Sequence, residues 1–176
     1  MELTKKDKII KYSVYCLVIA AAALLQNVSG LFPEVFRARC FLLIPVSVLL
    51  GLDEDEKNAA LLGLFAGFLW DMVSAHHMGF NCIFLMFFCY LSSALVTFVF
   101  RNTFWLGFVQ SAAVTVIYCL LYWLLFVLPT GRVGALGALG AFYIPCAVYT
   151  CAVTLILCLI LNPLIRKLNK EEQPEK

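Results

Sequence analysis

Long apolar stretches alternate with short polar segments along almost the whole chain. A helix that crosses a bilayer needs about 20 consecutive, mainly apolar residues. The pattern therefore predicts six membrane-spanning helices, near residues 12–31, 36–52, 58–74, 79–100, 103–128 and 140–161. The second and third stretches are shorter than a bilayer requires, so this pair could instead form a re-entrant hairpin. We favour two crossings, because a hairpin would leave the acidic turn 53–56 at membrane depth, whereas two crossings place it in water.

Composition agrees with this pattern. Hydrophobic residues make up 63% of the chain and charged residues only 14%, which lies far outside the range of soluble domains. We therefore expect one all-α transmembrane domain covering residues 1–176, in contact with the lipid bilayer along most of its length. The cations gather at the tails, as membrane topology requires, so no nucleic-acid partner is expected.

Positive charge also predicts the orientation of the helices. Cytoplasmic ends of membrane proteins retain Lys and Arg. On the predicted map, ten of the 13 Lys and Arg fall on the side of both termini. Those ten are Lys5, Lys6, Lys8, Lys11, Lys57, Arg101, Arg166, Lys167, Lys170 and Lys176. Both termini are therefore expected in the cytoplasm.

One acidic residue, Asp71, stands inside the third apolar stretch. A carboxylate in a membrane helix costs roughly 2.5 to 3.5 kcal/mol and normally faces protein or a polar cavity. Gly63, Gly67 and Asp71 are spaced four residues apart, which places them on one helix face with a small-residue groove beside the acid. Three roles remain open for Asp71: accepting hydrogen bonds from a neighbouring helix or turn, docking the helix of a partner, or coupling to an ion or proton.

Motifs for catalysis are missing from the sequence. It contains no phosphate-binding glycine loop, no nucleophile elbow and no HExxH zinc motif. Its eight cysteines include no CxxC pair, and seven lie in apolar runs, which is typical of packing residues. We therefore expect no enzyme activity, no catalytic residues, no cofactor and no metal site.

The segment around Asp71 resembles a known family. It reads Gly-Leu-Phe-Ala-Gly-Phe-Leu-Trp-Asp from Gly63 to Asp71, followed by Met-Gly-Phe-Asn from Met78 to Asn81. This is similar to the signature of the MreD family of bacterial rod shape-determining proteins. The short length, a Gln26 that ends the first apolar run, and a closing Asn-Pro-Leu before basic residues agree with that family. The acidic turn 53–56 is not part of the resemblance.

The resemblance implies a non-enzymatic scaffold of the cell-elongation machinery in the bacterial cytoplasmic membrane, acting in lateral peptidoglycan synthesis. Its expected partner is an MreC-like protein with one membrane span. Through that complex, the expected indirect partners are a cytoplasmic actin-like filament and the cell-wall glycosyltransferase and transpeptidase. The positions that match the motif are Gly63, Gly67, Asp71 and Gly79.

An alternative comes from a different class of protein. The substrate-binding subunits of energy-coupling-factor vitamin transporters are also small six-helix membrane proteins. They carry two alanines four residues apart in the first helix. The alanine run here, residues 20–23, contains no such pair, which weakens this alternative. A small channel or ion-coupled carrier would need polar residues on several helices, and few are available.

Overall fold

The computed structural model describes residues 5–27, 39–74, 79–98, 104–130 and 135–170. Within these ranges every regular element is helical and no strand occurs. The predicted all-α class is therefore confirmed for the described part of the chain. The main helices are α1 (Lys5–Asn27), α2 (Leu43–Gly51), α3 (Glu56–Val73), α4 (Phe80–Phe98), α5 (Phe104–Tyr122), α6 (Ala135–Ala138) and α7 (Ile144–Lys170).

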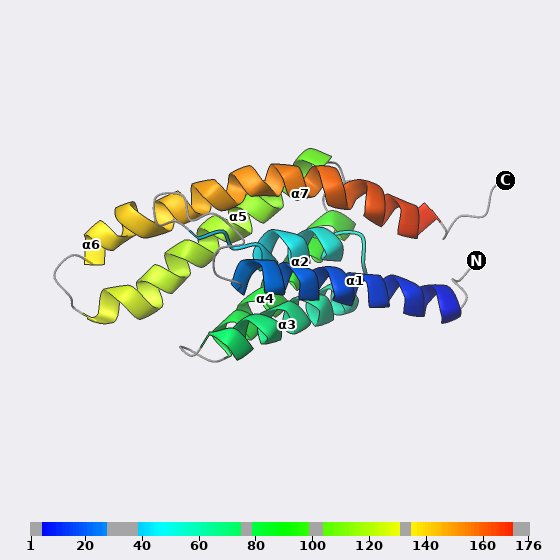
Figure 1. Ribbon diagram of the computed structural model, residues 1–176, viewed down its shortest axis with the longest axis horizontal. Coiled ribbons are helices and arrows are strands. Elements are labelled where there is room, and N and C mark those ends of the chain that lie inside the picture. Colours follow the sequence, from blue (N-terminus) through cyan, green and yellow to red (C-terminus); the bar gives the residue numbers. More distant parts are fainter. Residues whose placement is uncertain (1–4, 28–38, 75–78, 99–103, 131–134, 171–176) are drawn as a thin grey trace.

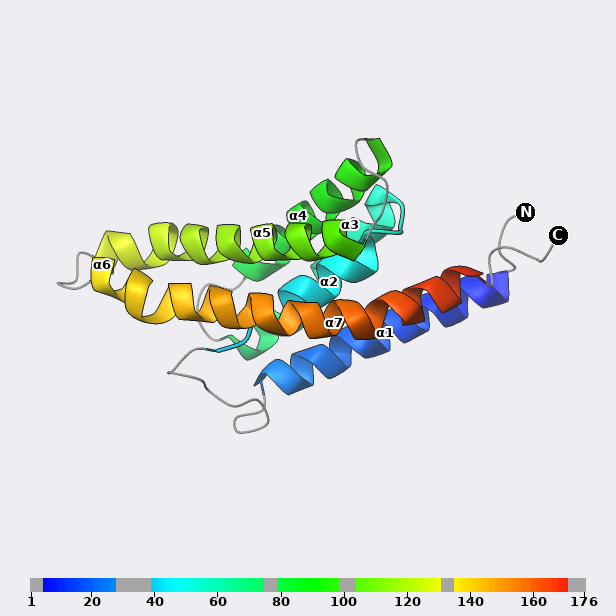
Figure 2. The same cartoon turned by 90° about the horizontal axis from the view of Figure 1, so that it is seen from above.

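Short non-α segments extend two of these helices. The π-helix η1 (Trp123–Val127) and the 3-10 turn η2 (Leu128–Thr130) continue α5, while the π-helix η3 (Leu139–Tyr143) joins α6 to α7. Figure 2 shows α5 and α7 side by side, reaching beyond the other helices where α6 lies.

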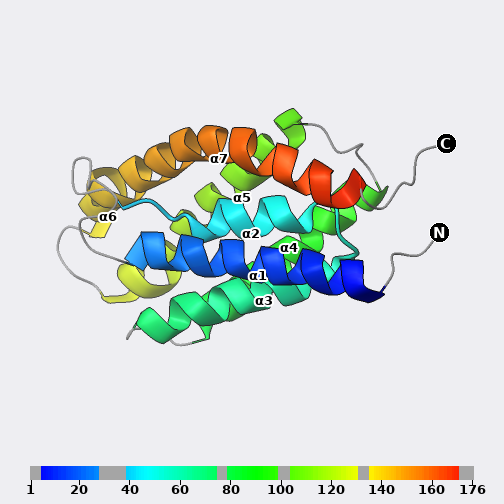
Figure 3. The same ribbon diagram turned by 45° about the vertical axis from the view of Figure 1, so that its right-hand side comes forward.

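The helices run in alternating directions along one long axis. α1 begins and α7 ends at one end of the molecule, called here the terminal end, and α6 lies at the opposite end, called the α6 end (Figure 1). α3 and α4 form the most extensively packed pair of helices. α2 occupies the centre, between α1 and α7 (Figure 3), and each of its nine residues is buried.

Within the described ranges, four helical segments are long and apolar enough to cross a membrane. They are Lys8–Asn27, Phe80–Phe98, Phe104–Val127 and Leu139–Asn169. They match the predicted first, fourth, fifth and sixth spans, although several ends of those predictions fall outside the described residues. α3 has 18 residues but carries Glu56, Lys57 and Asp71, and its bounds agree with the predicted third span to within two residues.

The predicted second span is wrong as a helix over 36–52. Residues 36–38 lie outside the described part, residues 39–41 have no regular structure, and α2 has only nine residues. A nine-residue helix is about 14 Å long, whereas the hydrocarbon core measures about 30 Å. The non-helical segment is tolerated because other parts of the protein satisfy its backbone: Phe41 N–H donates to Thr150 Oγ1 at 3.0 Å, and Leu43 N–H donates to Gln26 Oε1 at 2.9 Å.

The last helix is longer than predicted. Asn162 and Pro163 do not end it near residue 161, since α7 continues through Pro163 to Lys170. A proline inside a helix removes one backbone hydrogen bond without preventing helical geometry beyond it. Leu161 and Ile165, on either side of Pro163, are both buried, so packing supports the helix across the break.

Candidate functional site

Asp71 joins the end of α3 to the start of α4. Its side chain is buried, with 5% of its surface exposed. Oδ2 accepts hydrogen bonds from the backbone N–H groups of Gly79 and Cys82, each at 3.0 Å. Oδ1 accepts a third from Asn81 Nδ2 at 2.8 Å. All three donors lie within the first residues of α4 or directly before it.

This geometry has a simple electrostatic basis. The first N–H groups of a helix have no acceptor within it, and the helix dipole adds partial positive charge there. A capping side chain normally comes from the residue just before the helix. Here the acceptor is Asp71 on the preceding helix. Gly79 makes the approach possible, because its φ of 93° is in a region that residues with a side chain rarely adopt.

Asn81 extends the contact from α4 to α5. It is 4% exposed, and its Oδ1 accepts a hydrogen bond from Tyr118 OH at 2.8 Å. The Tyr118 ring stacks on Trp70 with centroids 5.1 Å apart and packs edge-on against Phe41 at 5.4 Å. The carboxylate is thereby tied to α3, α4, α5 and the segment before α2.

The glycine face of α3 lies directly against α4. A Cβ at Gly67 would lie 2.5 Å from Asn81 O and from Cys82 Cα, and one at Gly63 would lie 2.4 Å from Leu85 O. Both positions therefore require glycine for the two backbones to meet. The groove that the sequence offered to the helix of a partner is occupied by α4 of the same chain, so Gly63 and Gly67 are not a free docking surface.

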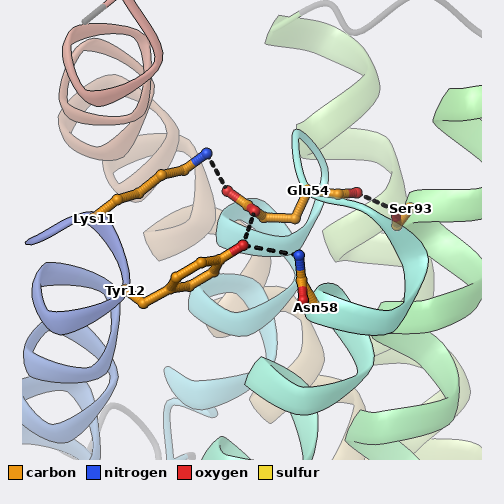
Figure 4. A network of polar contacts seen from close by, with 5 residues as sticks. All are labelled: Lys11, Tyr12, Glu54, Asn58 and Ser93. Atoms are coloured by element: carbon orange, nitrogen blue, oxygen red, sulfur yellow. Dashed lines mark hydrogen bonds and ion pairs between the residues drawn. The ribbon is translucent and has the colours of Figure 1, made fainter. Parts of the chain in front are cut away.

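A second polar cluster lies near the terminal end, and Figure 4 shows it. The Lys11 ammonium lies 2.6 Å from Glu54 Oε1, and Tyr12 OH donates to Glu54 Oε2 at 2.9 Å. Asn58 Nδ2 donates to Tyr12 OH at 2.8 Å, while Ser93 Oγ donates to the backbone carbonyl of Glu54 at 2.6 Å. The cluster joins α1, the α2–α3 turn, α3 and α4.

This cluster corrects the prediction for the acidic turn. Asp53 and Asp55 are exposed as expected, but Glu54 is only 7% exposed and Lys11 only 6%. The sequence offered four consecutive acidic residues with nothing to distinguish the second from its neighbours. The buried acid could be recognised only from its cation, which lies far earlier in the chain.

The structure brings most of the predicted motif residues together. Gly67, Asp71 and Gly79 meet at the start of α4, and Gly63 packs one helical turn further along the same face. Sequence reasoning missed the roles of Asn81 and Tyr118. A signal was present for Asn81, because it is a polar residue two positions after Gly79 in an otherwise apolar run.

No group of three or more His, Cys, Asp or Glu side chains among the described residues is arranged to hold a metal ion. Comparison with protein-family models, with curated proteins and with solved structures gave no match.

The arrangement of Asp71, Asn81 and Tyr118 provides acceptors and donors that are already paired with one another. It is suited to fixing helix positions.

Proposed function

We propose that the chain is a non-enzymatic scaffold of the cell-elongation machinery, which contributes to rod shape and lateral peptidoglycan synthesis by binding an MreC-like, single-span membrane protein. One observation carries the proposal: Asp71, the most unusual residue of the MreD-like segment, makes its hydrogen bonds to the start of α4. The motif is thus used to build a rigid helical hairpin. Such a hairpin can present a fixed surface to a partner.

The proposal includes an arrangement in the bacterial cytoplasmic membrane. Six segments cross, with the second crossing made by residues 39–52 inside the bundle and the third by α3. Both termini lie in the cytoplasm. The alternating helix directions (Figure 1) and the excess of Lys and Arg on the terminal side support this arrangement.

The partner's single helix docks outside the glycine groove, because α4 fills that groove. Association of helices in lipid depends on close packing and hydrogen bonds rather than on a hydrophobic driving force. A hairpin held by Asp71 keeps the outer helices at fixed positions, which lowers the cost of ordering them when the partner binds. The actin-like filament and the cell-wall enzymes join through the partner.

Depletion and complementation in a rod-shaped host test this function. Depletion should give rounded cells, and a tagged wild-type copy should restore rods and recover the single-span partner from detergent extracts. Asp71→Leu should fail in both respects, because it removes the acceptor for one buried donor and two part-buried donors. Met72→Leu is the matched control, since Met72 is the next residue and is 64% exposed.

The transporter alternative predicts a different result. Depletion would abolish uptake of one vitamin and leave cell shape unchanged, and the purified chain would carry a stoichiometric small ligand. Normal rods after depletion together with such a ligand would overturn the scaffold proposal.

A further inference from the structure

α2 is too short to hold its own position in the bundle. It has nine residues, and all of them are buried. Its N-cap residue, Leu42, provides no side-chain cap, so the first N–H groups of the helix need acceptors from elsewhere. In an apolar interior an unpaired backbone group is costly. The start of α2 therefore needs an acceptor from another element.

α1 reaches both ends of α2. At the start of α2, Gln26 Oε1 on α1 accepts the hydrogen bond from Leu43 N–H at 2.9 Å. Just after the end of α2, Glu54 receives Lys11 Nζ at 2.6 Å and Tyr12 OH at 2.9 Å. Both of these donors are on α1. Between the two contacts, α1 is packed into the core through Tyr15, Ile19, Ala22 and Ala23.

We propose that α1 acts as a strap that holds α2 in its place in the bundle. Gln26 of α1 binds the start of α2, and the Lys11–Glu54 ion pair, called here the latch, binds α1 to the turn after the end of α2. The latch closes only when the α2–α3 turn has returned to the side of the bundle on which α1 begins. It therefore enforces the orientation of residues 53–57 as well as the position of α2. The inference rests on the membrane arrangement proposed above, but not on any partner.

The ion pair is suited to a latch because the protein is much more stable with the two charges paired than with one of them left alone. A buried charge that loses its partner is strongly destabilising, whereas a pair replaced as a whole is tolerated far better. Ser93 Oγ holds the Glu54 carbonyl at 2.6 Å, and Glu54 N–H donates to Gly51 O at 3.2 Å. The acid is thus presented to α1 on a turn that α4 and the end of α2 already fix.

The reactivity of Cys89 reports whether α2 is in its place in the bundle. Cys89 is 0% exposed, and a Cβ at Gly51, the last residue of α2, would lie 3.9 Å from Cys89 Cβ. Departure of α2 would uncover one side of this residue, while α3 covers another, since a Cβ at Gly63 would lie 3.0 Å from Cys89 Cβ. Cells or membrane vesicles carrying the full chain are treated with a membrane-permeant maleimide, and the labelling rate at Cys89 is read by mass spectrometry.

Lys11→Met and Glu54→Gln should each raise the labelling rate at Cys89 by about tenfold or more, since each leaves one buried charge unpaired. The matched controls are Asp55→Asn in the same turn and Lys57→Met at the start of α3, which change exposed residues and should leave the rate within about twofold. Lys11→Met combined with Glu54→Gln should label more slowly than either single variant, because no unpaired charge remains.

Two results would overturn the strap. One is a labelling rate for the single variants that equals that of their controls. The other is a double variant whose increase is the product of the two single increases, which would mean that the residues act independently. If a single variant does not accumulate, the amount of chain in the membrane replaces the rate. Recovery in the double variant then supports the latch, and equal loss in the double variant contradicts it.

Discussion

Asp71 offers the most direct test of how the hairpin is held. In Asp71→Leu, the N–H groups of Gly79 and Cys82 and the amide of Asn81 lose their acceptor. Each buried donor without a partner costs about 1–3 kcal/mol. The Asn81 amide is buried and the two backbone N–H groups are part-buried, so taking the upper figure for the amide and the lower figure for each N–H gives a total loss on the order of 5 kcal/mol. Since domains are stable by about 5–15 kcal/mol, the Leu variant should be close to unfolding.

Asp71→Asn should lie between the Leu variant and the wild type. Asn keeps one oxygen, which can still accept from Gly79 and Cys82, as Oδ2 does now. Its amide nitrogen would then face Asn81 Nδ2, which is also a donor. One hydrogen bond is lost, at about 1–3 kcal/mol.

Thermal unfolding in detergent with a thiol-reactive fluorescent dye measures this order. The dye reacts as buried cysteines become exposed, and Cys89, Cys119, Cys146 and Cys158 are all buried. For a chain of this size, 1 kcal/mol corresponds to about 2–4 °C in Tm. We expect Tm to fall by about 5 °C for Asp71→Asn and by more than about 10 °C for Asp71→Leu.

Asp55→Asn serves as the control, because Asp55 is exposed and makes no side-chain cap to α3. Its Tm should match that of the wild type. An Asp71→Leu protein that melts within about 2 °C of the wild type would refute the assignment of Asp71 as the cap of α4.

The same melting assay checks three further changes. Gly67→Ala should lower Tm clearly, because its Cβ would lie 2.5 Å from the backbone of α4, while Gly137→Ala should not, since nothing lies within 4 Å of the added atom. Gly79→Ala should lower the free energy of unfolding by about 1–2 kcal/mol. Backbone strain is the sole cause, because the added Cβ has no atom within 4 Å, and an unchanged Tm would contradict the left-handed conformation of Gly79. Pro163→Ala should raise Tm, because an alanine can donate the missing hydrogen bond within α7, and a lower Tm would mean that the proline is needed where it stands.

Hydropathy predicted α3, α4 and the continuous helix of α5 and η1 to within a few residues, because these helices are separated by polar turns or breakers that also end the apolar runs. It failed for the second stretch, because the apolar run is continuous while the backbone changes from non-helical at 39–41 to helical in α2. The acceptors that permit this change are Gln26 and Thr150, which lie in other helices. The sequence of the second stretch itself therefore could not indicate these acceptors.

The candidate site shows the same limit. The cost of burying a carboxylate predicted that Asp71 would face protein or a polar cavity, and the spacing of Gly63 and Gly67 predicted a close helix contact on that face. The identity of the contacting helix depends on the path of the chain after residue 74. The pairing of Lys11 with Glu54 depends on the whole arrangement of α1 and α2, so the sequence could not indicate it.

The central position of α2 has a consequence for biosynthesis. Residues 39–41, which lead into α2, are made early, yet the Arg39 N–H donates to Cys146 Sγ at 3.3 Å and the Phe41 N–H donates to Thr150 Oγ1. These acceptors belong to α7 and are made 107 and 109 residues later in the chain. Until it arrives, the segment has polar backbone groups that lipid cannot satisfy. The interior of the bundle therefore closes only after α7 has been made, and a chain that stops before α7 cannot finish its core.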